Sequence, residues 1–198
     1  MNVSVDDIKK LRELTGVGLT DAKKALVETD GDFDKALEAM RKKGLTKAEK
    51  KGDREAREGL IEGYVHSGRI GVVVEVNCET DFVARLDDFK TLAHEIAMQI
   101  AAMSPKYVSE ADIPAEEMER VRTELMASEA LASKPEEMRE KIVEGQLKKH
   151  FVEQVLMSQA YILDDSKTVE QHIKEVIAKL GENIVVRQFR RIELGVSE

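Results

Sequence analysis

The sequence predicts an α+β fold, in which three short helices precede a small antiparallel sheet of about three strands. Three patterns support this fold class. Apolar residues recur with helical spacing near the N-terminus, two strand-like runs flank a tight turn at residues 67–69, and an amphipathic helical stripe follows the second run. Two strands joined by so short a turn are expected to pair as a hairpin.

Residues 1–45 are predicted to form a small three-helix module. Ser4, Thr20 and Asp32 are candidate N-caps for its three helices, and Gly44 is expected to end the third. About 40 residues are marginal for independent stability, so this module should be tightly packed. Its size and its glycine-broken first loop resemble ubiquitin-associated domains, which is a likeness of fold only.

Residues 46–58 carry dense mixed charge and are expected to be a linker, with a solvated helix as the alternative. Residues 59–198 should form the core domain. Strands are predicted at 60–66 and 70–76, followed by a helix whose apolar stripe packs against the sheet. That stripe consists of Phe89, Leu92, Ala93, Ile96, Ala97 and Ile100.

Two charged helical runs, 115–131 and 135–151, are separated only by residues 132–134. Such a short connection predicts an antiparallel pair. Their apolar positions are too sparse to cover a sheet, so a projecting helical hairpin at about 115–151 is expected. Thr168 and Gln171 form a capping box that begins a last helix, and the strand-like run 184–194 should complete the sheet.

Composition limits the classes of function. Acidic residues exceed basic ones by 39 to 31, a net charge of −8, which argues against direct nucleic-acid binding. No apolar run is long enough for a membrane span, and the N-terminus lacks a signal-peptide pattern. A single cysteine, Cys78, forbids an intrachain disulfide, although an interchain one stays open. We therefore expect a cytoplasmic protein without membrane association.

The sequence also argues against enzymatic chemistry. The four histidines are scattered without metal-ligand spacing, and no glycine-rich phosphate loop follows a strand. We therefore expect no metal, no cofactor and no catalytic residues.

The most informative segment is residues 75–85, where a strand ends in a polar turn that presents Asp81 beside Phe82. A carboxylate next to a large aromatic, just before a helical pattern, suits insertion into another molecule. The structural alternatives are that Asp81 forms the turn or caps the helix and that Phe82 fills the core beneath it.

Three blocks of sequence resemble one family, bacterial elongation factor Ts. The first is 77–84 (NCETDFVA), the second is 11–18 (LRELTGVG) with 21–26 (DAKKAL), and the third comprises 135–149 and 166–169. The blocks follow the family's order and span nearly the whole chain. At 198 residues, the chain is similar to short forms with one core repeat rather than two.

The resemblance implies a guanine-nucleotide exchange factor that binds the GTPase elongation factor Tu and promotes GDP release during translation elongation. In the family, the matching Asp-Phe pair reaches the nucleotide domain and disturbs its magnesium site. Carried over, the magnesium-dislocating segment is Thr80, Asp81, Phe82 and Val83, with Phe82 as the wedge.

Further partner contacts are implied at Arg12, Leu19, Thr20 and His66. Positions 19 and 20 are Leu and Thr in this sequence, whereas related chains can carry two methionines there. The structural alternatives to these contacts are that Thr20 only caps a helix and that His66 only caps the hairpin. A single core repeat makes a homodimer with one GTPase per protomer attractive. The rival hypothesis is an adaptor that binds ubiquitin-like proteins or peptides through its three-helix module.

Overall fold

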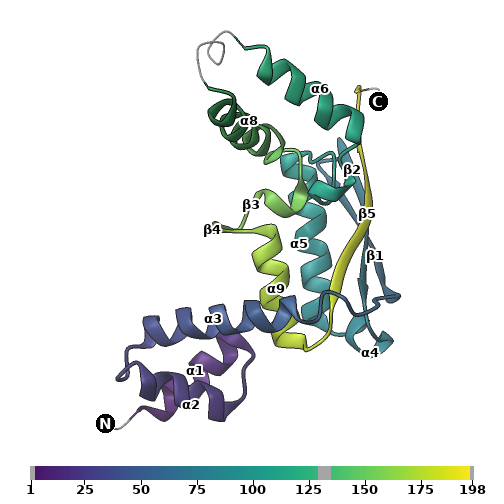
Figure 1. Ribbon diagram of the computed structural model, residues 1–198. Coiled ribbons are helices and arrows are strands. Elements are labelled where there is room, and N and C mark those ends of the chain that lie inside the picture. The colour runs from purple at the N-terminus through teal and green to yellow at the C-terminus, as the bar shows by residue number, and fades with distance from the viewer. Residues whose placement is uncertain (1–2, 129–134, 197–198) are drawn as a thin grey trace.

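The computed structural model describes residues 3–128 and 135–196 (Figure 1). The elements, in chain order, are α1 (Val5–Thr15), α2 (Leu19–Glu28), α3 (Phe33–Glu49), β1 (Glu58–His66), β2 (Ile70–Cys78), α4 (Asp81–Ala84), α5 (Asp87–Met103), η1 (Glu110–Asp112), α6 (Ala115–Met126), α8 (Glu136–Phe151), η2 (Leu156–Ser158), β3 (Ala160–Tyr161), β4 (Asp164–Thr168), α9 (Val169–Leu180) and β5 (Ile184–Glu193). The predicted α+β class is confirmed. None of the described helices is both long enough and apolar enough to cross a membrane.

The first three helices pack around a small core of their own. Its buried members are Leu11, Ala22, Ala25, Leu26, Ala36 and Met40. Two of the predicted caps are confirmed, because Ser4 Oγ accepts from the Asp6 amide at 3.2 Å and Asp32 Oδ1 accepts from the Lys35 amide at 3.1 Å. Each cap satisfies a backbone donor that the first turn of a helix leaves free.

The prediction that Gly44 ends the third helix is wrong, because α3 continues to Glu49. A Cβ at Gly44 would lie 3.2 Å from the Cβ of Ala178 in α9, so this glycine permits close helix crossing rather than termination. Gly16 has a φ of +65°, and its Cβ would meet the Lys179 backbone at 2.7 Å. These two glycines let the N-terminal helices approach α9.

The first residues of the expected linker, 46–49, thus belong to α3. Residues 50–57 connect α3 to β1, with Ala56 among them buried, and Glu58 is already the first residue of β1. The division into 1–45, 46–58 and 59–198 stays a prediction.

The predicted three-stranded antiparallel sheet is confirmed, with the order β1-β2-β5. Helix α5 covers one face of the sheet, and α9 packs beyond α5 (Figure 1). The apolar stripe of α5 is buried as predicted, and Phe89 is 0% exposed. The capping box of α9 is also confirmed, because Thr168 Oγ1 accepts from the Gln171 amide and Gln171 Oε1 accepts from the Thr168 amide.

Helices α6 and α8 form the predicted projecting hairpin, at the end of the molecule opposite to the N-terminal helices (Figure 1). They share a separate apolar cluster at their base, whose buried members are Ile113, Val121, Phe151 and Val155. Helix α6 ends at Met126, earlier than the expected 131. The predicted connection at 132–134 lies outside the described residues. The short β3–β4 pair was not predicted.

Candidate functional site

The Asp81–Phe82 pair lies on a single helical turn at the end of β2. This turn, residues 80–84, is called the α4 turn below. Thr80 is its N-cap, and Thr80 Oγ1 accepts from the Val83 amide at 3.4 Å. The Val83 side chain is buried in the core, whereas Phe82 is 77% exposed. The alternative that Phe82 fills the core is therefore wrong, because its ring lies on the surface.

Asp81 is the first residue of α4, and its carboxylate pairs with Arg85 one turn later at 2.7 Å. The Arg85 side chain is exposed and that of Asp81 is about half exposed, so this ion pair adds little stability and both groups stay open to a partner. The cap of the turn is Thr80, and the expected capping role of Asp81 is not observed.

Two carboxylates connect the α4 turn to the loop between α9 and β5. Glu182 binds Thr80 twice: Oε2 accepts from the backbone amide at 3.0 Å and Oε1 accepts from the hydroxyl at 2.7 Å. Glu79 Oε1 accepts from the Asn183 amide at 2.7 Å. The two chain segments thus exchange carboxylate–amide hydrogen bonds in both directions. We call these four residues, Glu79, Thr80, Glu182 and Asn183, the crossed clamp.

Cys78 lies directly beneath the α4 turn and is fully buried. Its Sγ donates to the Thr80 carbonyl oxygen at 3.1 Å. Burial, together with the nearby Glu182 charge, raises the pKa of the thiol to about 11. The thiol is therefore protonated at neutral pH, which disfavours thiolate chemistry such as disulfide exchange.

The other predicted contact residues lie elsewhere. Arg12, Leu19 and Thr20 are each exposed, and the helices that carry them, α1 and α2, lie near the same end of the molecule as α4 (Figure 1). The prediction that Thr20 caps α2 is wrong, because Gly18 occupies the N-cap. Gly18 suffices there because glycine readily adopts the extended N-cap conformation.

His66 lies at the far end of β1 from the α4 turn. Glu58 at the start of β1 pairs with Cys78, whereas His66 pairs with Ile70 beside the hairpin turn. The length of β1 therefore separates His66 from the α4 turn by about 25 Å. His66 is exposed, and its Nδ1 lies 3.0 Å from the Tyr64 hydroxyl. The structure therefore keeps residues 80–83 on one turn, with Phe82 exposed and Val83 buried, and leaves His66 apart from it.

The second exposed feature is the sheet face opposite to α5, which no described element covers (Figure 1). Four apolar side chains on this open face are 52–72% exposed: Ile61, Val65, Val73 and Ile192. The strand register aligns Val65 and Ile192 on either side of Gly71. Glu75 and Arg190 lie on the same face, so the apolar patch has charges of both signs beside it.

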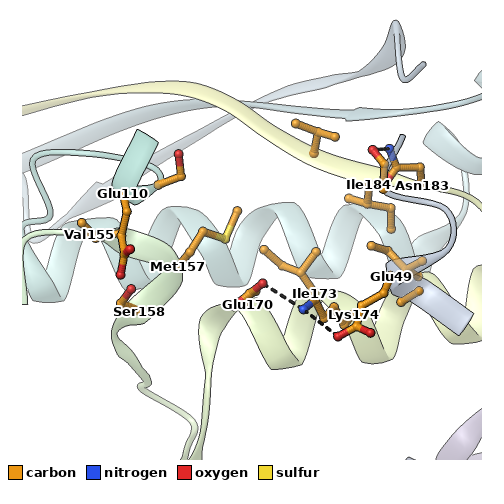
Figure 2. A pocket seen from close by; sticks show the side chains of 15 residues that line it. Glu49, Glu110, Val155, Met157, Ser158, Glu170, Ile173, Lys174, Asn183 and Ile184 are labelled. Carbon is orange, nitrogen blue, oxygen red and sulfur yellow. Dashed lines mark hydrogen bonds and ion pairs between the residues drawn. The ribbon is translucent and has the colours of Figure 1, made fainter. Parts of the chain in front are cut away.

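A groove of about 540 Å³ lies between α9 and the start of β5 (Figure 2). Its lining is mainly apolar, including Ile173 and Ile184. Lys174 Nζ pairs with Glu170 at 2.9 Å and with Glu49 at 3.5 Å. The hydrogen bond that Lys174 donates to Glu170 is the main reason that the pKa of Lys174 is raised. In the described part of the chain, no three His, Cys, Asp or Glu residues are placed to hold a metal ion.

An exposed aromatic on a hydrogen-bonded turn, together with an open apolar sheet face, is typical of the class of proteins that act by contacting other proteins. The family model described as Elongation factor TS matches residues 45–196. The chain is 55% identical over 196 residues to elongation factor Ts of Thermotoga neapolitana, covering 98% of each chain. It is 52% identical to elongation factor Ts of Thermoanaerobacter sp. strain X514, over 98% of this chain and 95% of the relative. The chain belongs to the elongation factor Ts family.

Glu182 and Asn183 are the residues that sequence reasoning missed. They lie 102 and 104 positions from their partners in the α4 turn region, and no local pattern reports such a contact. The only signal was their place just after Gly181, a glycine at which α9 ends.

Proposed function

We propose that this elongation factor acts as a guanine-nucleotide exchange factor for elongation factor Tu, with the α4 turn as the segment that disturbs the magnesium and phosphate site. The observation that carries the proposal is the exposure of Phe82, at 77%, on a turn that the crossed clamp fixes. Membership of the elongation factor Ts family supports the choice of GTPase. Arg12, Leu19, Thr20 and His66 are proposed as further contacts.

The mechanism follows from thermodynamic linkage. A factor that binds the nucleotide-free GTPase better than the GDP-bound form must weaken GDP affinity by the same ratio. Magnesium is a large local charge at a phosphate site, so a wedge that displaces it loosens the phosphate end of GDP. The chain itself breaks no bond under this proposal. It needs no cofactor and is not an enzyme.

Formation of a complex that nucleotide dissolves would test the proposal. We expect the purified protein to form a stable complex with nucleotide-free elongation factor Tu, and we expect GDP with magnesium to dissociate it. Size-exclusion chromatography gives the first result, and stopped-flow release of a fluorescent GDP gives the accompanying acceleration. A protein that binds the GTPase equally well with and without GDP would contradict the proposal, since it could not shift nucleotide affinity.

The adaptor hypothesis makes a different prediction, because its partner would be a ubiquitin-like protein or a peptide held by the three-helix module. Capture of such partners, without capture of nucleotide-free elongation factor Tu, would favour it. Family membership favours the exchange factor. The net charge of −8 is compatible with a protein partner and argues against direct nucleic-acid binding, and we propose that the factor works in the cytoplasm.

We further propose that the protein forms a homodimer through the open sheet face. Two copies related by a twofold axis would bury Ile61, Val65, Val73 and Ile192 against the same residues of the second copy. Such symmetry can also place Glu75 of one copy near Arg190 of the other. Val65 and Ile192 lie at the opposite end of the sheet from the α4 turn, so both protomers would keep Phe82 free for a GTPase.

We expect the parent protein to sediment at about twice 22.2 kDa, and the Ile192→Glu variant to sediment at about 22.2 kDa. A charge placed in a desolvated apolar interface is costly, which is why one substitution should suffice. Leu163→Glu is the control, because Leu163 is 60% exposed but lies on the β3–β4 connection. A parent of monomer mass, or a dimer unaffected by Ile192→Glu, would contradict this interface.

A further inference from the structure

The α4 turn has little intrinsic stability. Four residues are too few to sustain a helix by themselves, since the first turn costs more conformational entropy than its hydrogen bonds return. The exposed ring of Phe82 contributes no core packing. The position of that ring therefore depends on what holds the two ends of the turn. Val83 anchors one side in the core, and Thr80 anchors the other.

Thr80 is held mainly by Glu182. Both carboxylate oxygens are used, one by the Thr80 amide at 3.0 Å and the other by the Thr80 hydroxyl at 2.7 Å. Two bonds to one residue fix direction as well as distance, and hydrogen bonds to an ionised acceptor are stronger than neutral ones. The site is partly buried, so water competes less than at an open surface. The same hydroxyl accepts from the Val83 amide, which extends the restraint into α4.

The loop that carries Glu182 is itself fixed. Asn183 is buried, and its Nδ2 donates to the Gly52 and Arg54 carbonyl oxygens at 3.2 and 2.7 Å. The Asn183 amide donates to Glu79, which closes the crossed clamp from the other side. Glu182 is therefore held in place by contacts other than those with Thr80, and it restrains the position of Thr80.

We propose that Glu182 is a positioning residue for nucleotide release, which acts by holding Thr80 so that Phe82 projects at one orientation. The inference rests on the proposed function of the α4 turn. A misplaced wedge still allows the rest of the interface to bind, but it reaches the magnesium site less often. Loss of Glu182 should therefore lower the maximal rate of GDP release more than it weakens association.

The test measures GDP release from elongation factor Tu by stopped flow across concentrations of the full-length factor. We expect Glu182→Ala to lower the maximal release rate about tenfold, with a change of less than about threefold in the half-saturating concentration. Glu182→Gln keeps one acceptor oxygen and should lose about two- to threefold. In the Phe82→Ala background, Glu182→Ala should cause no further loss, because a positioning residue has nothing left to position.

Glu95→Gln is the matched control, since Glu95 also uses a partly buried carboxylate to join two distant elements, through His172 at 2.8 Å. It should lower the melting temperature without lowering the release rate. If Glu182→Ala releases GDP at the parent rate while Phe82→Ala is slow, the proposed role of Glu182 is wrong but the wedge role of Phe82 stands. A further loss in the Phe82→Ala background also overturns the role of Glu182. A parent-like rate for Phe82→Ala instead overturns the wedge itself.

Discussion

Phe82→Ala is expected to lower the maximal acceleration of GDP release about 10- to 30-fold while association with GDP-bound elongation factor Tu stays within about threefold of the parent. An aromatic side chain that becomes fully buried in a partner typically contributes about 2 kcal/mol or more, and each 1.4 kcal/mol is a factor of ten. Phe82 has this surface to contribute, because its ring is 77% exposed in the free protein. Stopped-flow GDP release gives the rate, and titration of the GDP-bound GTPase gives the affinity before the wedge has acted.

Leu163→Ala is the matched control for this experiment. Leu163 is a comparably exposed apolar residue, at 60%, on the β3–β4 connection, away from the α4 turn. Its replacement should leave the release rate unchanged. Equal rates for the parent and Phe82→Ala would show that the ring does not act as a wedge.

Phe89→Ala is expected to have the opposite profile, with a large effect on stability. Phe89 is 0% exposed, and it packs in the core between α5 and the sheet. Truncation of a buried phenylalanine removes its transfer free energy and leaves a cavity, so the free energy of unfolding should fall by about 3–5 kcal/mol. Urea denaturation followed by circular dichroism measures this loss.

Phe82→Ala provides the comparison within the same chain, since an exposed side chain away from core packing should change stability by no more than about 0.5 kcal/mol. The two phenylalanines are seven positions apart, and each should affect only one of the two properties. A similar stability loss for both variants would mean that the Phe82 ring contributes to the fold.

Much of the fold was predictable because its signals are local. Helix caps at Ser4, Asp32 and Thr168 depend on residues two or three positions away, and the β1–β2 hairpin depends on a three-residue turn. Apolar periodicity identified α5 because its buried face repeats within one element. The predicted three-stranded sheet followed from these signals and from the strand-like run that became β5.

The errors had different causes, and a distant contact explains one of them. Gly44 looked like a helix stop, but its missing side chain serves the crossing of α3 over α9. Thr20 looked like a cap, yet α2 begins after Gly18. The β3–β4 pair is too short for a periodic pattern to show.

The candidate site was also predictable only in part. The Asp81–Phe82 pair was recognisable because it follows a strand directly and resembles a family signature. Sequence reasoning left open whether Phe82 is buried or exposed, since both are compatible with a short helix after a strand. The role of Glu182 depends on a contact across 102 residues, which one sequence does not report.

The close approach of Gly16 and Gly44 to α9 has a consequence for selectivity. Because backbone touches helix at these points, the N-terminal helices sit at a fixed span from the end of the sheet. A GTPase that engages both Leu19 and Phe82 must present two surfaces separated by that same span. Recognition would then depend on the dimensions of the target as well as on its chemistry, and a β-carbon at either glycine would alter which targets fit.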